Sequence, residues 1–307
     1  MKTLAARSFA KINLELRILG RREDGYHEIK TVLQSIDLHD EMTFEEARTI
    51  SLEVTGVPGV PADETNLALR AARLLAARHP GRGARIRLRK RIPAGAGLGG
   101  GSSNAAVTLM ALDRLWGLDA DPGLLYALAR SIGSDVPFFL YRGTCLGLGR
   151  GDEIAPMPDT AALSVVLLCP EKPLPTAEVY GRLSLPLTSK PILSSIKGFF
   201  PGTPTRETTH PVRAPASDVF PDPVNDLEPT AFGMMPELAR LKERLLASGA
   251  RVAAMSGSGS AVFGLYSGTR DPAELAAEAA TDEAAVMACR TLTREAYRIQ
   301  LFERSRT

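Results

Sequence analysis

Apolar and polar side chains alternate over residues 8 to 18, and this period of two predicts a β-strand with one apolar face. The apolar set is Ile12, Leu14, Leu16 and Ile18, and the polar set is Lys11, Asn13, Glu15 and Arg17. Strand-like runs also cover residues 30–38, 49–55 and 84–92. In the last of these, arginines alternate with apolar residues, so we expect one face of that strand to contact water.

Four segments have apolar residues at helical spacing, which predicts a helix in each. These helices are expected from Thr65 to Arg78, from Ser102 or Ser103 to Gly117, from Asp121 to Gly133, and up to Gly249. Their apolar stripes are Leu67, Ala71, Leu74 and Leu75; Ala105, Leu109, Leu112 and Trp116; Leu124, Leu125, Leu128 and Ile132; and Leu238, Leu241 and Leu245.

The second half of the chain opens with an apolar run over residues 163–169 that predicts a buried strand. A strand–turn–strand is expected over residues 253–263. Residues 186–223 hold eight prolines and little periodicity, which indicates an exposed excursion. Mixed strands and helices of this kind predict an α+β protein in two lobes, with domains at residues 1–158 and 159–307.

The composition is that of an ordinary soluble globule: 307 residues, 44% hydrophobic and 23% charged, with a formal net charge of +2. Such a near-neutral chain gives no argument for a nucleic-acid or membrane partner. The one local concentration of charge is at residues 82–91, which hold six basic side chains. Two interpretations stay open, a solvated strand face and long-range attraction of a polyphosphate.

Other compositional signals are mostly negative. Three widely spaced cysteines indicate reduced thiols in a cytoplasmic protein. The four histidines have no metal-ligand spacing, so no zinc site is predicted. The N-terminal residues lack the apolar core of a signal peptide, and no window approaches the ~20 apolar residues of a membrane span.

The most informative segment is the glycine-rich run from Pro93 to Asn104. It holds five glycines within seven residues, which lets backbone N–H groups approach an anion closely. Because a helix is expected to follow at once, its unpaired N–H groups and dipole would converge on the same point. The run therefore predicts a phosphate-binding loop, the alternative being a glycine-rich turn without a ligand.

Two familiar phosphate loops fit this run poorly. The GxxxxGK pattern is missing, since the run contains no lysine. Gly95, Gly97 and Gly100 satisfy GxGxxG, but the preceding strand alternates instead of being continuously apolar, unlike the first strand of a dinucleotide-binding fold.

Phosphoryl transfer also needs a group that deprotonates the acceptor and a cation that offsets charge. Asp135 lies between the helix end at Gly133 and Pro137, and Lys11 lies in the first strand. Taken singly, Asp135 is more typical of a helix cap and Lys11 of a solvated strand face. Together with the glycine-rich loop, they become candidates for a base and its cationic partner.

The motifs resemble those of the GHMP small-molecule kinases, a family that includes galactose, homoserine, mevalonate and phosphomevalonate kinases. The run from Pro93 to Ala106 is similar to the family's second motif, and residues 255–263 are similar to its third. Four further segments, residues 10–14, 24–29, 133–139 and 225–228, resemble the branch whose acceptor is 4-diphosphocytidyl-2-C-methyl-D-erythritol. The resemblance implies a two-lobed fold, with an N-terminal ATP-binding lobe and a C-terminal α/β sandwich lobe.

The resemblance further implies ATP-dependent phosphorylation of the acceptor's tertiary 2-hydroxyl, in the non-mevalonate route to isoprenoid precursors. Asp135 matches the catalytic base and Lys11 its partner, while Asn13 is a candidate for holding the substrate. ATP is expected along the loop and near Asn66, that is, at Asn66, Pro93, Ala94, Gly95, Ala96, Gly97, Leu98, Gly99, Gly100, Gly101, Ser102, Ser103 and Asn104. Mg²⁺ is expected to accompany ATP, with no side-chain ligand assigned.

On the acceptor side, Tyr26 and His27 match the family's cytidine site. Tyr180 falls where the family usually has an aromatic that sandwiches the cytosine, and Thr176, four residues earlier, is a further candidate for binding the substrate. An aromatic face suits stacking on a base. In one respect the sequence departs from the pattern, because Asp152 stands where the family often has Glu. A small-molecule partner and a monomer or weak homodimer are expected.

Three alternatives remain open at this stage. One is another GHMP kinase acting on a sugar or mevalonate derivative. Another is a non-catalytic nucleotide-binding protein on the same scaffold. The third is a nucleic-acid-binding protein that uses residues 82–91, which predicts strongly salt-dependent affinity.

Overall fold

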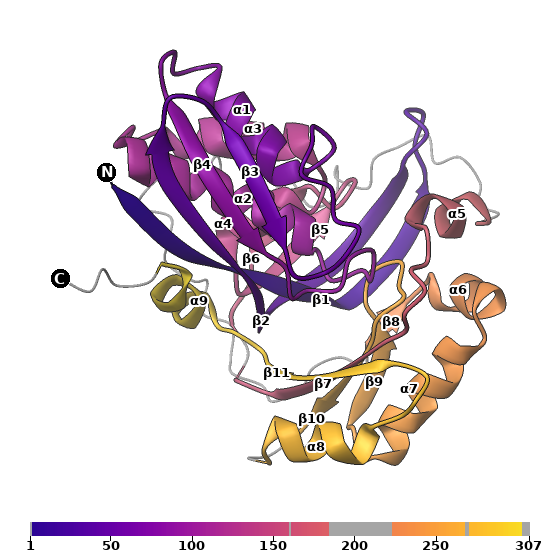
Figure 1. Cartoon of the computed structure of the whole chain (residues 1–307). Helices are drawn as coiled ribbons and strands as arrows, with labels where there is room; N and C mark the ends of the chain where they lie inside the picture. Colours follow the sequence, from indigo (N-terminus) through magenta and orange to yellow (C-terminus); the bar gives the residue numbers. More distant parts are fainter. Residues whose placement is uncertain (1, 160, 184–222, 268–269, 303–307) are drawn as a thin grey trace.

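The computed structural model describes residues 2–159, 161–183, 223–267 and 270–302. The predicted excursion at 186–223 therefore lies, except for its last residue, outside the described residues. The fold is α+β, as predicted, with two sheets and helices around them (Figure 1).

The first sheet has seven strands. Its main path runs β3 (Ser51–Thr55), β4 (Gly83–Arg89), β2 (His27–Ala47), β1 (Thr3–Arg21) and β8 (Val224–Asn225), and β5 (Thr144–Leu148) joins β2 to β6 (Glu153–Pro156). The long β1 and β2 form an antiparallel pair with shifts in register, one of them between Asn13 and Glu15. β2 is a single strand of 21 residues, longer than the run predicted from sequence.

Four helices cover one face of this sheet (Figure 1): α1 (Leu67–Ala76), α2 (Gly100–Trp116), α3 (Pro122–Ile132) and α4 (Val136–Tyr141). The predicted stripe of α2 is buried throughout. The apolar stripe predicted for α1 was partly wrong. Leu74 is exposed, whereas Ala68 and Ala72, which the prediction left out, are buried. The last helix, α9 (Arg294–Leu301), returns to this first core through Tyr297 and Leu301.

The second sheet has the order β11 (Ala285–Arg290), β7 (Ser164–Cys169), β10 (Val262–Tyr266) and β9 (Val252–Met255). α6 (Glu228–Met234), α7 (Glu237–Ala247) and α8 (Pro272–Ala279) pack on one of its faces, while α5 (Thr176–Gly181) lies beside β8 and α6 in the view of Figure 1. β7 is buried on both faces, as its apolar run predicted: Val166 and Leu168 point to these helices, and Val165 and Leu167 point to β1 and β2. This shared core joins the two lobes.

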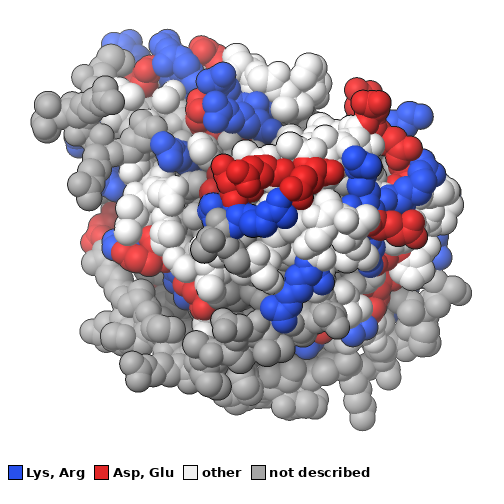
Figure 2. Space-filling view, turned by 90° about the horizontal axis from the view of Figure 1, so that it is seen from below, with Lys and Arg blue, Asp and Glu red and all other residues white. Residues whose placement is uncertain are grey.

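Three arginines of the basic run at 82–91, Arg85, Arg87 and Arg89, lie on the outer face of β4, whereas Lys90 is buried. The arginines from Arg85 to Arg91 alternate with buried residues and pair with glutamates of the neighbouring strands. The pairs are Arg85–Glu45, Arg87–Glu45, Arg87–Glu53, Arg89–Glu41 and Arg91–Glu41. This supports the interpretation as a solvated strand face, and acidic and basic side chains are likewise mixed over the described part of the surface in Figure 2. Within the described ranges, no helix is both long and apolar enough to cross a bilayer.

Candidate active site

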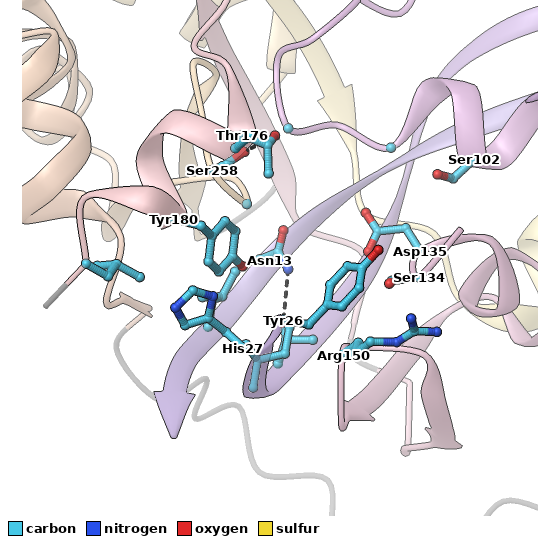
Figure 3. A pocket seen from close by; sticks show the side chains of 18 of the residues that line it. Asn13, Tyr26, His27, Ser102, Ser134, Asp135, Arg150, Thr176, Tyr180 and Ser258 are labelled. Carbon is cyan, nitrogen blue, oxygen red and sulfur yellow. Dashed lines mark hydrogen bonds between the residues drawn. The ribbon is translucent and has the colours of Figure 1, made fainter. Parts of the chain in front are cut away.

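A cavity of about 760 Å³ opens between the two lobes, and Figure 3 shows the side chains around it. Its walls come from β1 and β2, the start of α2, the segment before α4, α5, and the turn between β9 and β10. A smaller cavity of about 300 Å³ lies along the glycine-rich loop. Gly97, Gly99 and Ser102 line both cavities, so the loop is where the two meet.

Lys11 and Asp135 come together in the larger cavity, although 124 positions separate them. The Lys11 ammonium lies 3.5 Å from an Asp135 carboxylate oxygen. It also donates a hydrogen bond of 2.6 Å to Asn13 Oδ1, and Asn13 in turn donates one of 2.8 Å to Thr31 Oγ1. Lys11 is only 3% exposed, so the interpretation as a solvated lysine was wrong.

Asp135 precedes α4 but does not cap it. Its side chain makes no capping hydrogen bond, and Pro137 at the second helical position has no N–H to offer. The carboxylate is 38% exposed and faces the cavity (Figure 3). The structure thus leaves this group available for chemistry rather than for helix capping.

The glycine-rich loop is held from behind by the turn between β9 and β10. Ser256 Oγ donates to the Gly97 carbonyl at 3.0 Å, and the Ala261 N–H donates to the Ala96 carbonyl at 3.1 Å. Gly97 has φ +77°, and a Cβ there would lie 2.1 Å from the Ser256 carbonyl oxygen. Residue 97 must therefore be glycine for the loop to keep this path.

α2 begins at Gly100, two or three residues before the predicted start at Ser102 or Ser103. Its N-cap is Gly99, with φ +70°, and no side chain caps this end. The first N–H groups of the helix thus point along the loop without side-chain partners. A cradle of this kind fits an anion such as a phosphate group.

The residues predicted to bind ATP separate into two groups. Asn66, residues 93–102 and Asn104 line the smaller cavity, whereas Ser103 does not. Ser103 is fully buried, and its hydroxyl accepts a hydrogen bond from Ser8. Asn66 caps α1 by accepting from the Ala68 N–H and also donates to the Pro61 carbonyl, so its amide is already hydrogen-bonded.

Behind the loop lies a buried polar cluster that sequence reasoning missed. Asp40 accepts hydrogen bonds from Lys90 and Asn104 through one oxygen, and from the backbone N–H groups of Arg91 and Ile92 through the other. Lys90 also donates to Asn104 Oδ1 at 3.1 Å. Asp40 thereby holds the chain at the entry of the loop and at its exit into α2. The sequence did contain a signal that Lys90 is buried, because the period of two places it on the same face as Ile86, Leu88 and Ile92.

The residues predicted to bind the acceptor, Tyr26, His27, Thr176 and Tyr180, also line the larger cavity. The rings of His27 and Tyr180 are 5.0 Å apart and inclined by 37°. Tyr26 is 55% exposed, and the Arg150 guanidinium lies over its ring at 4.9 Å. Thr176 hydrogen-bonds to Ser258 at 2.7 Å. Burial lowers the pKa of His27, to which Arg21 adds, and burial raises the pKa of Tyr180. The imidazole therefore favours its neutral form.

Comparisons with known proteins show the family to which the chain belongs. Profiles described as the GHMP kinases N terminal domain and the GHMP kinases C terminal match residues 66–143 and 216–285. A 4-diphosphocytidyl-2-C-methyl-D-erythritol kinase of Solibacter usitatus is 44% identical over 85% of this chain and 80% of its own length. One of Pelotomaculum thermopropionicum is 41% identical over 94% and 98%. The chain belongs to the 4-diphosphocytidyl-2-C-methyl-D-erythritol kinase family.

Solved structures point the same way. A crystal structure of 4-(cytidine 5'-diphospho)-2C-methyl-D-erythritol kinase superposes with a TM-score of 0.70 at 36% identity, over 94% of this chain and 98% of that one. A homoserine kinase of Cytophaga hutchinsonii gives 0.66 at 17% identity over 95% and 96%, which shows the shared fold. The predicted resemblance and fold class are confirmed, and family membership makes this chain an ATP-dependent small-molecule kinase.

Proposed function

We propose that this chain transfers the terminal phosphoryl group of ATP to the 2-hydroxyl of 4-diphosphocytidyl-2-C-methyl-D-erythritol, in the non-mevalonate route to isoprenoid precursors. The observation that carries the proposal is the Lys11–Asp135 pair, which lines the larger cavity beside the loop shared with the smaller one. A phosphoryl donor in one cavity and an acceptor in the other would meet at this pair.

In this proposal Asp135 is the base. Its exposed carboxylate accepts the hydroxyl proton while the acceptor oxygen bonds to phosphorus and the bond to ADP breaks. Lys11, 3.5 Å from that carboxylate, offsets the negative charge that develops on the acceptor oxygen and on the oxygens of the transferring phosphoryl group. Asn13 fixes the ammonium through their 2.6 Å hydrogen bond, and Thr31 fixes the amide of Asn13.

The nucleotide side rests on the loop. N–H groups at the start of α2 hold phosphate oxygens, and the tight path through Gly97 lets the backbone approach them. ATP with Mg²⁺ supplies the transferable phosphoryl group and a cation that offsets phosphate charge. The described residues include no group of three or more His, Cys, Asp or Glu side chains suited to a metal ion.

The acceptor side rests on aromatic residues. Tyr26, His27 and Tyr180 offer ring faces and a neutral imidazole edge to a base such as cytosine. A GHMP kinase acting on a sugar or on mevalonate has no use for such a base site, and this favours the cytidine-bearing acceptor. A cytoplasmic location and a monomer or weak homodimer stay predictions, as do the domain boundaries at 158 and 159.

The test is turnover with defined acceptors. Purified protein is incubated with ATP, Mg²⁺ and, separately, 4-diphosphocytidyl-2-C-methyl-D-erythritol, mevalonate, homoserine or galactose, while ADP release is followed. We expect turnover with the first acceptor alone. Asp282→Asn, which changes an exposed carboxylate that lines neither cavity, is the control for Asp135→Asn. Equal turnover with an acceptor that lacks cytidine would reject the proposal.

A further inference from the structure

Arg150 is a charged residue of the larger cavity to which the mechanism above gives no role. It follows β5 in a tight turn, and its side chain is 31% exposed. Its guanidinium hydrogen-bonds to Asp152 at 3.3 Å and covers the ring of Tyr26. In Figure 3 it lies beside Tyr26, on the side of the cavity that carries Ser134 and Asp135 and away from Tyr180 and Thr176.

The guanidinium is held by a buried anchor. Asp152 is 2% exposed, and one of its oxygens accepts hydrogen bonds from Arg150 and also from Arg130, at 2.8 and 2.9 Å. Burial alone would raise the pKa of Asp152, but these two arginines outweigh burial and lower it. The carboxylate therefore stays ionised, and a single negative charge serves two guanidinium groups.

Among the described side chains that line the cavity, positive charges outnumber negative ones. Of these described residues, the positive ones that line it are Lys11, Arg21 and Arg150, and the negative one is Asp135. Lys11 already pairs with Asp135. Asp24, on the loop that carries Tyr26, interacts electrostatically with Arg150. It accepts hydrogen bonds from Arg22 and from the Tyr26 N–H and does not line the cavity. A guanidinium has five N–H donors in a planar fork, and the bond from Nη2 to Asp152 uses one of them.

We propose that Arg150 binds an anionic group of the acceptor, the diphosphate that links the nucleoside to the phosphorylated alcohol. This rests on the proposed function. Covalent connectivity requires the diphosphate to lie between the base and the reacting hydroxyl. Arg150 touches the aromatic residue expected at the base, on the wall that leads to Asp135. Its fork matches phosphate oxygens, and Asp152 prevents it from turning away into solvent.

The structure also provides a matched control. Arg130 binds the same oxygen of Asp152 but does not line the cavity. Arg150→Gln and Arg130→Gln each remove one guanidinium from that carboxylate, so any general effect on the fold is shared. Only Arg150→Gln is expected to change how the affinity depends on the charge of the ligand.

The experiment is calorimetric binding of cytidine and of CDP, with the ATP site filled by a non-hydrolysable ATP analogue. The wild type is expected to bind CDP more tightly than cytidine. Arg150→Gln should weaken CDP binding about tenfold and change cytidine binding less than about twofold. Arg130→Gln should leave both affinities within about twofold of the wild type. Arg150→Met repeats the test if Arg150→Gln does not fold.

Several results would overturn the inference. Equal losses for cytidine and CDP in Arg150→Gln would mean that Arg150 acts only by orienting Tyr26. The inference would also fall if Arg150→Gln kept the wild-type preference for CDP over cytidine, or if Arg130→Gln lost as much CDP affinity as Arg150→Gln. If the wild type binds neither ligand, the inference and the proposed function both fall. If CDP binding depends on Arg150 while the diphosphocytidyl acceptor is not phosphorylated, the proposed function alone falls.

Discussion

Two lysine–carboxylate pairs flank the glycine-rich loop, and they differ in what surrounds them. Lys11 and Asp135 are 3.5 Å apart, with the carboxylate 38% exposed to the cavity. Lys90 and Asp40 are both buried, and Asp40 accepts four hydrogen bonds. The same two residue types thus form one open pair and one saturated pair. Saturation leaves a group no capacity for a ligand, so the open pair suits chemistry and the saturated pair suits support of the loop.

The comparison is tested most strongly by removing the charge of the open carboxylate. Asp135→Asn should lower turnover about 10²–10⁴-fold, because the acceptor hydroxyl loses its base. ADP affinity and the midpoint of thermal unfolding should stay near the wild-type values, since this side chain supports no helix cap. Steady-state kinetics, ADP titration and thermal melting measure the three quantities. Full activity in this variant would reject Asp135 as the base.

Removing the saturated carboxylate should give the opposite pattern. Asp40→Ala leaves the Lys90 ammonium buried without a counter-charge, so the free energy of unfolding should fall by about 3–5 kcal/mol. Chemical denaturation measures it. The double variant Asp40→Leu with Lys90→Met should recover much of the loss, because no charge is then left unpaired. If Asp40→Ala is as stable as the wild type, the cluster does not support the loop.

The two lysines can be compared through the same substitution. Lys11→Met should reduce turnover by about 10²–10³-fold with little change in stability, since it removes the cation at the reacting oxygens. Lys90→Met should lower the free energy of unfolding by about 3 kcal/mol, because Asp40 then keeps a buried charge without its cation. Activity per folded molecule, from kinetics corrected for the folded fraction, separates the two. If the two variants showed the same changes in turnover and in stability, the two lysines would not have the different roles assigned to them.

The smallest effect is expected at the edge of the cluster. Ser8→Ala removes a hydroxyl that accepts from Asn104 and donates to Ser103. Asn104 keeps its bond to Asp40, so the loss of unfolding free energy should be about 1 kcal/mol, with an unchanged KM for the acceptor. A change in acceptor KM would show that the cluster reaches beyond the nucleotide side.

Much of the fold was predictable from local patterns. The alternation around Lys11 and Asn13 gave β1, and the caps at Asp121 and Gly117 gave helix ends that the structure keeps. Leu74 was misassigned because an apolar residue at helical spacing can still point to solvent at the stripe's margin. The predicted start of α2 was two or three residues late, since serine is the commoner N-cap and Gly99 takes that position through a positive φ.

The site was predictable only in part, for a physical reason. The glycine-rich loop stands out locally, and it made Asp135 and Lys11 candidates. Asp40 and Arg150, in contrast, act through contacts between distant parts of the chain. Asp40 accepts a hydrogen bond from Asn104, which is 64 positions away in the sequence. Arg150, which follows β5, lies over the ring of Tyr26, which precedes β2. A carboxylate just beyond a predicted strand, or an arginine in a turn, looks like ordinary surface until packing shows what it touches.

One measurement tests the contrast between the two pairs directly. The single-turnover rate at saturating ATP and acceptor is determined beside the dissociation constant for ADP, in Asp135→Asn and in Asp40→Asn. We predict that Asp135→Asn loses at least about 10²-fold in rate with ADP binding intact, and that Asp40→Asn loses ADP affinity with a rate much closer to the wild type. The reverse assignment, with binding lost in Asp135→Asn and the rate lost in Asp40→Asn, would contradict this account.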